Sequence, residues 1–319
     1  MSQEINKQVK TRLHPRNKNR ERYDLQALIQ AIPELKNHVK PSKQGSDSID
    51  FANPRAVKLL NQALLHHYYG IEKWDFPDEN LCPPIPGRAD YLHHMADLLA
   101  ENNDGIIPTG DRVTCLDVGV GASCIYPIIG VTEYDWQFIG CDVNSKSLES
   151  AQQIIDSNPQ LENKISCRLQ NNPKSIFRGI LERDEKIDLS ICNPPFHSSK
   201  KEAQKGSRRK IKNLSGKREK TPTLNFSGIN NELIYFGGEY QFIINMIKES
   251  EFIGKNCLWF TTLVSKQSNV ERIYKLLDKT DIFQLKTIAM GTGNKSSRIV
   301  AWTFLSSEER QAWGQKRWQ

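Results

Sequence analysis

The sequence contains no apolar run close to the roughly 20 residues that a bilayer-spanning helix requires. Its first six residues also lack the apolar core of a secretory signal peptide. Seven cysteines form no Cys-x-x-Cys pair and no even framework, which argues against a zinc site or a disulfide scaffold. His66-His67 and His93-His94 are adjacent pairs, whose side chains point apart on a helix. We therefore expect a cytoplasmic protein with no metal and no membrane partner.

The net charge of +7 is modest, but the positive charge is concentrated in two short segments. Residues 1–22 carry seven basic and two acidic residues, and residues 198–220 carry ten and two. These segments together hold +13, which leaves −6 for the rest of the chain. Solvated tails are one interpretation. Two such segments on an acidic body favour a polyanionic partner, because Lys and Arg displace counterions from phosphates.

The first third of the chain predicts helices. Asn53 is a good N-cap, Pro54 suits the first helical position and Gly70 suits a left-handed stop, so a helix is expected between them. A second helix is expected over 88–101. We divide the chain into a basic flexible arm (1–22), a helical module (23–90) and an α/β domain (91–319), which includes a basic substrate loop at 198–235.

From residue 113 onward, short apolar strands alternate with helical patterns, which predicts a mostly parallel, seven-stranded sheet with helices on both faces. A close final pair of strands predicts an antiparallel hairpin at one edge. The expected strands are 113–118, 136–142, 164–169, 187–192, 256–264, 282–290 and 298–305, and the expected helices 145–156, 238–250 and 266–279.

A glycine turn, Asp-Val-Gly-Val-Gly-Ala-Ser at residues 117–123, follows the first of these strands and opens a helix. Cys124 stands where the dinucleotide fingerprint requires its third glycine, which disfavours a pyrophosphate at the helix N-terminus. An acid before the glycines, Asp117, suits a ligand with a cationic amino-acid end such as S-adenosylmethionine. Asp142 ends the next strand and is placed to bind ribose hydroxyls. NAD binding and a purely structural turn remain alternatives.

The sequence Asn193-Pro194-Pro195-Phe196 follows the expected fourth strand. Two prolines cannot continue a strand ladder, so the chain must leave the sheet with a stiff backbone. In open α/β sheets, ligands bind at the carboxyl ends of the strands. We therefore expect this corner and the glycine turn to share one site.

Such a corner suits methylation of an exocyclic amine. The lone pair of an exocyclic amine on a base is delocalised into the ring, so the amine nitrogen is a poor nucleophile. The side-chain carbonyl of Asn193 and the backbone carbonyl of Pro194 can accept its two N–H hydrogens, which turns the lone pair out of conjugation. Phe196 can stack on a base that has been unstacked from its strand. Positioning then supplies most of the catalysis, and no metal or strong base is required.

At this point the sequence resembles the class I (Rossmann-like) methyltransferases that modify exocyclic amines. Several stretches resemble the bacterial family of 23S ribosomal RNA adenine-1618 N6-methyltransferases more closely, and the animal methyltransferase-like sixteen family is similar over the same core. The resemblance spans residues 11–305, and Ser123 departs from the third glycine that is common in class I enzymes. The stretches are Asp-Phe-Ala-Asn-Pro-Arg (50–55), Pro-Gly-Arg-Ala-Asp-Tyr-Leu-His (86–93), Gly-Val-Gly-Ala-Ser-Cys-Ile-Tyr-Pro (119–127) and Gly-Thr-Gly-Asn-Lys-Ser-Ser-Arg (291–298).

The resemblance implies S-adenosylmethionine as cofactor and a set of residues that contact it. The expected cofactor-binding residues are Arg88, Asp117, Gly119, Gly121, Ser123, Asp142, Ser175 and Asn193, and the expected catalytic residues are Asn193, Pro194, Pro195 and Phe196. Arg88 would pair with the methionine carboxylate, and Ser175 would flank the adenine. Lys295, Ser296 and Arg298 would touch substrate or support the catalytic corner. A purely structural role remains an alternative for Arg298, which introduces the last strand.

The resemblance also implies 23S ribosomal RNA, or a large-subunit assembly intermediate, as the partner of a monomeric enzyme. The expected RNA-binding residues are Lys200, Lys201, Arg208, Arg209, Lys210, Lys212, Arg12 and Arg16. Trp313 and Trp318 either stack on bases or pack on the body. Methylation of guanine N2 in RNA, adenine N6 in DNA or a protein glutamine remains an alternative, as does an inactive RNA-binding assembly factor.

Overall fold

The computed structural model describes residues 13–41, 45, 47–199, 202, 233–292 and 295–319. Its helices are α1 (Leu25–Ala31), α2 (Pro54–Tyr69), α3 (Ile85–Ala100), α4 (Ile125–Tyr134), α5 (Ser145–Asp156), α8 (Gly238–Ile253), α9 (Gln267–Leu277) and α10 (Ser307–Arg317). Its strands are β1 (Val39–Pro41), β2 (Asp47–Ile49), β3 (Thr114–Val118), β4 (Gln137–Asp142), β5 (Ile165–Leu169), β6 (Ile187–Cys192), β7 (Cys257–Val264), β8 (Gln284–Thr292) and β9 (Lys295–Thr303). Short 3₁₀ turns occupy Pro33–His38, Pro159–Leu161 and Gly254–Asn256.

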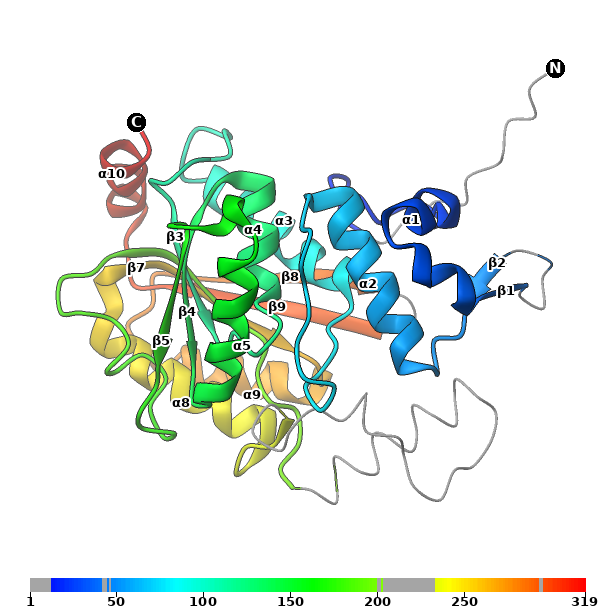
Figure 1. Ribbon diagram of the computed structural model, residues 1–319. Helices are drawn as coiled ribbons and strands as arrows, with labels where there is room; N and C mark the ends of the chain where they lie inside the picture. The colour runs from blue at the N-terminus through cyan, green and yellow to red at the C-terminus, as the bar shows by residue number, and fades with distance from the viewer. Residues whose placement is uncertain (1–12, 42–44, 46, 200–201, 203–232, 293–294) are drawn as a thin grey trace.

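One seven-stranded sheet forms the centre of the molecule (Figure 1). Its strand order is β5-β4-β3-β6-β7-β9-β8. The first five of these strands are parallel, whereas β9 runs antiparallel to both β7 and β8. The α/β fold with a terminal antiparallel hairpin is therefore confirmed. Strand order reverses at β3, because the chain passes outward through β4 and β5 and then returns to place β6 on the other side. Ligand sites of open α/β sheets occur beside such a reversal.

Each face of the sheet buries its own apolar core, because successive strand residues point to opposite sides. Cys115 of β3 and Phe138 of β4 belong to the core that includes α2, α3, α4 and α5. Their chain neighbours Leu116 and Ile139 belong to the core beneath α8 and α9. The helices on both faces hold the carboxyl ends of the central strands in fixed positions.

Local sequence signals predicted most of these elements correctly. Asn53 caps α2 by accepting from the backbone N–H groups of Arg55 and Ala56, and Gly70 ends the helix at φ +66°. The short α1, the two-stranded β1–β2 sheet and the C-terminal helix α10 were not predicted. Ser306 and Glu309 form a capping box at the start of α10, a pattern readable in the sequence.

The expected division of the chain needs two corrections. The boundary at residue 90 falls inside the continuous helix α3. Within the expected flexible arm, the described residues from Leu13 onward pack on the body, and Leu13, Asn17 and Asn19 are buried. The backbone N–H of His14 donates to Asp90 Oδ1 at 2.6 Å, which fastens this segment to α3.

At its C-terminus the chain packs on the body through a buried carboxylate. Asp188, at the start of β6, accepts from the indole N–H groups of Trp313 at 2.7 Å and Trp318 at 3.1 Å. Arg317 also pairs with Asp188 at 3.2 Å. Both tryptophans thus hold α10 against the sheet. No helix within the described part of the chain is long and apolar enough to cross a membrane.

Candidate active site at the carboxyl edge of the sheet

The glycine turn after β3 is fixed by backbone geometry that only glycine adopts easily. Gly119 and Gly121 have φ values of +79° and +64°. The N–H groups of Gly119 and Val120 both donate to the carbonyl of Cys141 at 2.9 Å, and Gly121 N–H donates to Asp142 Oδ2 at 3.1 Å. The turn is therefore held against the end of β4, and Asp142 is oriented by the turn it faces.

Neighbouring elements fix the remaining part of this turn. The indole N–H of Trp74 donates to the carbonyl of Ser123 at 2.8 Å, and the Ser150 hydroxyl donates to the carbonyl of Ala122 at 3.1 Å. Cys124, at the position of the missing third glycine, is buried with φ +52°. A cysteine thus adopts a left-handed conformation here, which tertiary packing must stabilise.

The Asn-Pro-Pro-Phe corner lies beside the glycine turn. β6 pairs with β3 up to Val118 and Cys192, the last residue of each strand. Asn193 therefore leaves the sheet at the same edge as Gly119, and both residues line a common cavity. The corner therefore faces this cavity, as methylation of an amine at the corner would require.

This cavity has a volume of about 370 Å³ and brings together most of the expected site residues. Arg88, Gly119, Gly121, Ser123, Asp142, Ser175, Asn193, Pro194 and Pro195 line it. Asp117 and Phe196 are not among the lining residues. Asp117 is fully buried behind the turn, and Phe196 is half-buried directly after the lining prolines.

Asp117 presents a buried carboxyl group without a hydrogen-bond partner close to this cavity. Its carboxylate is about 1% exposed, and neither oxygen has a hydrogen-bond partner within the described residues. Burial raises the pKa of Asp117 to about 8; the charge of Arg88 opposes this shift, and that of Asp142 adds to it. Because a buried carboxylate without a partner is costly, a cationic ligand group nearby would stabilise it.

Arg88 extends from the first turn of α3 to the cavity. Its Nη1 donates to the Tyr126 hydroxyl at 2.9 Å, and its guanidinium lies 5.2 Å from the centre of the Tyr126 ring. No carboxylate forms an ion pair with Arg88 among the side chains described. Its charge is therefore available to an anionic ligand group.

Several cavity residues were not predicted from the sequence. Tyr126 lay within a recognised stretch, but its own role was not inferred. Tyr235 and Phe242 also line the cavity, and their rings pack edge-to-face with centres 5.1 Å apart. Tyr235 is the last residue of the expected basic loop and Phe242 lies in α8, and neither belongs to a local motif. Only the tertiary structure brings them to the cavity, because the carbonyl and N–H of His197 pair with the chain at 233–235.

The expected RNA-binding residues are only partly described. Arg12, Lys200, Lys201, Arg208, Arg209, Lys210 and Lys212 lie outside the described residues. Arg16 is described, and its guanidinium donates to Asp97, to the Tyr134 hydroxyl and to the carbonyl of His93. At the terminal hairpin, Arg298 pairs with Val264 at the carboxyl end of β7, and its Nη1 is buried with no described partner.

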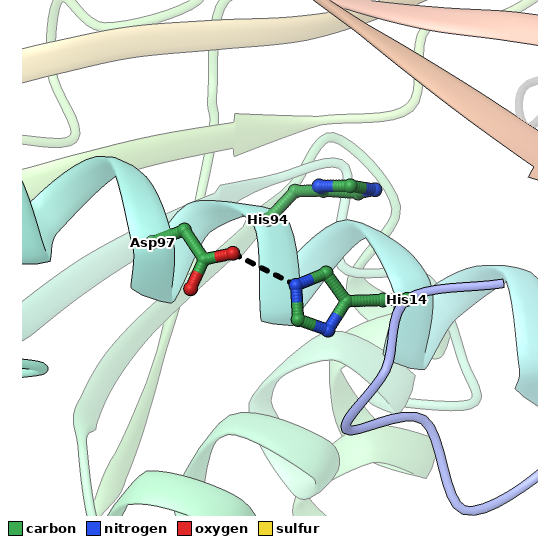
Figure 2. A group of neighbouring side chains, drawn as sticks. All are labelled: His14, His94 and Asp97. Carbon is green, nitrogen blue, oxygen red and sulfur yellow. Dashed lines mark hydrogen bonds and ion pairs between the residues drawn. The ribbon is translucent and has the colours of Figure 1, made fainter.

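His14, His94 and Asp97 form a compact group between the N-terminal segment and α3 (Figure 2). His14 Nδ1 accepts from the Arg16 backbone N–H at 3.2 Å, so the ring proton is on Nε2, which donates to Asp97 at 2.8 Å. A histidine that ligates a metal through Nε2 donates through its other nitrogen. The hydrogen bonds here run in the opposite sense and make the group an anchor for the N-terminal segment.

The chain resembles known proteins over nearly its whole length. A family model described as RNA methyltransferase matches residues 7–306. Ribosomal RNA large subunit methyltransferase F of Serratia proteamaculans is 52% identical over 98% of this chain and 93% of its own length. The protein of the same name from Cytophaga hutchinsonii is 51% identical over 97% and 96%.

Solved structures resemble the whole domain. The human METTL16 catalytic domain in complex with a MAT2A 3′UTR hairpin superposes with a TM-score of 0.77 at 26% identity, over 92% of this chain and 96% of that one. The human METTL16 N-terminal domain in complex with SAH has a TM-score of 0.72 at 24% identity, over 92% and 99%, and shares the fold.

The sheet order, the glycine turn and the proline corner together define a class I methyltransferase, an enzyme. The near full-length matches narrow this class further. The chain belongs to the RNA methyltransferase family and, within it, to the family of ribosomal RNA large subunit methyltransferase F.

Proposed function

We propose that this enzyme transfers a methyl group from S-adenosylmethionine to the exocyclic N6 of one adenine in 23S ribosomal RNA, at position 1618 by family resemblance. The observation that carries the proposal is the single cavity shared by Asn193 and the cofactor-type residues Arg88 and Asp142. Relatives about half identical to this chain are named for ribosomal RNA methylation, which supports RNA as substrate.

The residues present fit this cofactor. The unpartnered carboxylate of Asp117 suits a nearby ammonium, and the positive φ of Gly119 lets the backbone approach a ligand closely. Arg88 would hold the methionine carboxylate, and Asp142 would accept from ribose hydroxyls. When bound, S-adenosylmethionine supplies an electrophilic methyl group on a sulfonium. Ser123 and Ser175 also line the cavity, and Ser175 would flank the adenine of the cofactor.

The proline corner performs the remaining work on the amine. The Asn193 side-chain carbonyl and the Pro194 backbone carbonyl accept the two N–H hydrogens of adenine N6, which directs its lone pair away from the ring. Phe196 stacks on the extruded base. The methylated amine releases one proton to solvent after transfer, and S-adenosylhomocysteine is the other product. Orientation, rather than a strong general base, therefore provides the rate enhancement.

The basic segments would bind the RNA backbone. The segment at 198–220 begins two residues after Phe196 and so starts beside the site. Only unpaired or looped RNA offers a base that can be extruded at low cost. The N-terminal residues up to Arg12 would add cationic contacts from the opposite end of the chain. The enzyme would act as a monomer.

Methyl transfer from labelled S-adenosylmethionine tests the proposal. Total RNA, DNA and protein from cells that lack the enzyme serve as substrates, and nucleoside mass spectrometry identifies the product. We expect N6-methyladenosine at one site in 23S RNA. Label in protein glutamine, in guanine N2 or in DNA would overturn the proposal. Absence of cofactor binding by calorimetry would instead favour an RNA-binding assembly factor.

Asn193→Ala is the matched test of the corner. We expect methyl transfer to fall by at least about 100-fold, because the amine loses an acceptor that orients it. Cofactor affinity, measured separately by calorimetry, should change little. Normal turnover in this variant would remove Asn193 from the mechanism.

A further inference from the structure

Tyr91 contacts the end of β6, which leads into the Asn-Pro-Pro-Phe corner. It belongs to α3, is completely buried, and is not among the residues that line the cavity. Its hydroxyl contacts two other elements: it lies 2.8 Å from Thr261 Oγ1 of β7 and 3.5 Å from the backbone N of Cys192 of β6. Cys192 immediately precedes Asn193 in the chain.

The donors and acceptors fix the direction of every bond in this group. Thr261 donates its only hydroxyl proton to the carbonyl of Ser190 at 2.6 Å, so its oxygen accepts the proton of Tyr91. The Tyr91 oxygen in turn accepts the N–H of Cys192.

This chain of bonds replaces a missing part of the sheet ladder. β6 pairs with β3 as far as Cys192, but its pairing with β7 ends at Ser190 and Phe260. Beyond that pair, Cys192 has no strand partner on the β7 side. Backbone N–H groups buried in this way require an acceptor. The Tyr91 hydroxyl supplies one where β6 separates from β7 and turns into the corner.

We propose that Tyr91 is a positioning residue for Asn193. By holding Cys192 in place, its hydroxyl sets the point at which the chain leaves the sheet and the direction in which Asn193 presents its carbonyl. This inference rests on the proposed function of the corner, which it deepens.

The Tyr91 ring also contacts the part of the site that contains Arg88. It packs edge-to-face against Tyr126 with ring centres 5.5 Å apart, and Tyr126 accepts a hydrogen bond from Arg88. One buried side chain thus contacts both the strand that precedes the amine-binding corner and the tyrosine that orients Arg88. The ring aligns the two halves by packing, and the hydroxyl fixes the corner.

Tyr91→Phe separates these contributions, because it keeps the ring and removes only the hydroxyl. We expect kcat for RNA methylation to fall about 10- to 100-fold, since a small misplacement of an orienting group has an effect of this size. KM for S-adenosylmethionine should stay within about twofold, as Arg88 and Tyr126 keep their contacts. Amide exchange followed by mass spectrometry should become faster in the peptide that contains Cys192 and Asn193.

Three further variants separate positioning from general stability. Thr261→Val breaks the same chain of bonds and should reproduce the loss in kcat, whereas Thr261→Ser keeps a hydroxyl and should retain most activity. Ser250→Ala is the control: it removes a buried hydroxyl that also makes two hydrogen bonds, to Ile247 and Trp302, at the far end of α8. We expect wild-type kcat in this variant.

The outcomes distinguish this proposal from the proposed function. A wild-type enzyme that methylates no RNA would contradict the function, and the exchange measurement would still report on the Tyr91 bond. If the wild type is active and Tyr91→Phe matches it in kcat and in exchange at Cys192, Tyr91 does not position the corner. Equal losses of kcat in Tyr91→Phe and Ser250→Ala would assign the effect to stability and overturn the proposal.

Discussion

The N–H of Gly121 donates to Asp142 Oδ2 at 3.1 Å, so one carboxylate both fixes the glycine turn and faces the cavity. Its other oxygen accepts from the Asn144 backbone N–H at 2.9 Å. These bonds orient the carboxylate before any ligand arrives. The site is preorganised at this point, which reduces the entropy lost when a ligand binds.

Asp142→Ala removes this preorganised acceptor. We expect affinity for S-adenosylmethionine to fall about 10- to 100-fold, because hydrogen bonds to a charged group contribute about 1.5–3 kcal/mol. Isothermal calorimetry measures the loss. Asp156→Ala, at the opposite end of α5 and exposed, is the control and should bind normally. Unchanged affinity in Asp142→Ala would place the ribose elsewhere.

Asp117→Asn should weaken cofactor binding and raise the stability of the ligand-free protein. Burial raises the pKa of Asp117 to about 8, against about 3.9 in an unfolded chain, so the folded state binds more protons between these values. Stability of the wild type therefore falls as pH rises from about 4 to about 8. The variant lacks this loss and should be more stable at pH 8, by roughly 1–3 kcal/mol.

Urea unfolding of the ligand-free protein at pH 5 and pH 8 measures this difference, which should be larger at pH 8. The same variant should bind S-adenosylmethionine more weakly, because the ammonium loses a negative partner. A variant that is less stable than the wild type at pH 8 would show that Asp117 has a compensating partner in solution.

His93 should make the fold sensitive to acid. Its Nδ1 lies 2.6 Å from the Tyr134 hydroxyl, and burial, together with His14 and Arg16, lowers the pKa of His93 to about 3. An unfolded histidine titrates near 6.5, so the unfolded state binds the extra proton first. Stability is therefore complete above pH 6.5 and falls as pH decreases toward 3.

His93→Gln keeps a side chain that can bond to Tyr134 but does not titrate. We expect its stability to depend less on pH between 6.5 and 4 than that of the wild type, measured by denaturant unfolding. Identical pH profiles for the two proteins would remove His93 as the cause.

Asp188→Ala should destabilise the C-terminal packing without altering the site. The substitution leaves two indole N–H groups and Arg317 without their shared acceptor, at a cost of about 3–5 kcal/mol for a broken buried pair. Thermal unfolding measures the loss. Because Asp188 lies at the opposite end of β6 from Asn193, kcat of the folded fraction should be unchanged. A reduced kcat at full folding would connect α10 to catalysis.

Local signals in the sequence predicted the parts of the site that a motif encodes. Gly119 and Gly121 are required by positive φ, and Pro194 and Pro195 by the exit from a strand, so these residues could be placed from the sequence. Tyr235 could not, because it reaches the cavity through pairing between His197 and the chain at 233–235. Nor could the packing of Arg16, which depends on Asp97 and Tyr134 in distant helices.

The amino-acid sequence alone determined the alternating α/β order, the capped helix α2 and the two corners at the carboxyl ends of β3 and β6, since each depends on backbone preferences of neighbouring residues. Only the tertiary structure decided that Asp117 is buried without a partner, that His14 anchors the N-terminal segment and that Tyr91 supports Cys192. These relationships join residues from separate elements, and burial and hydrogen-bond geometry exist only after those elements have packed together.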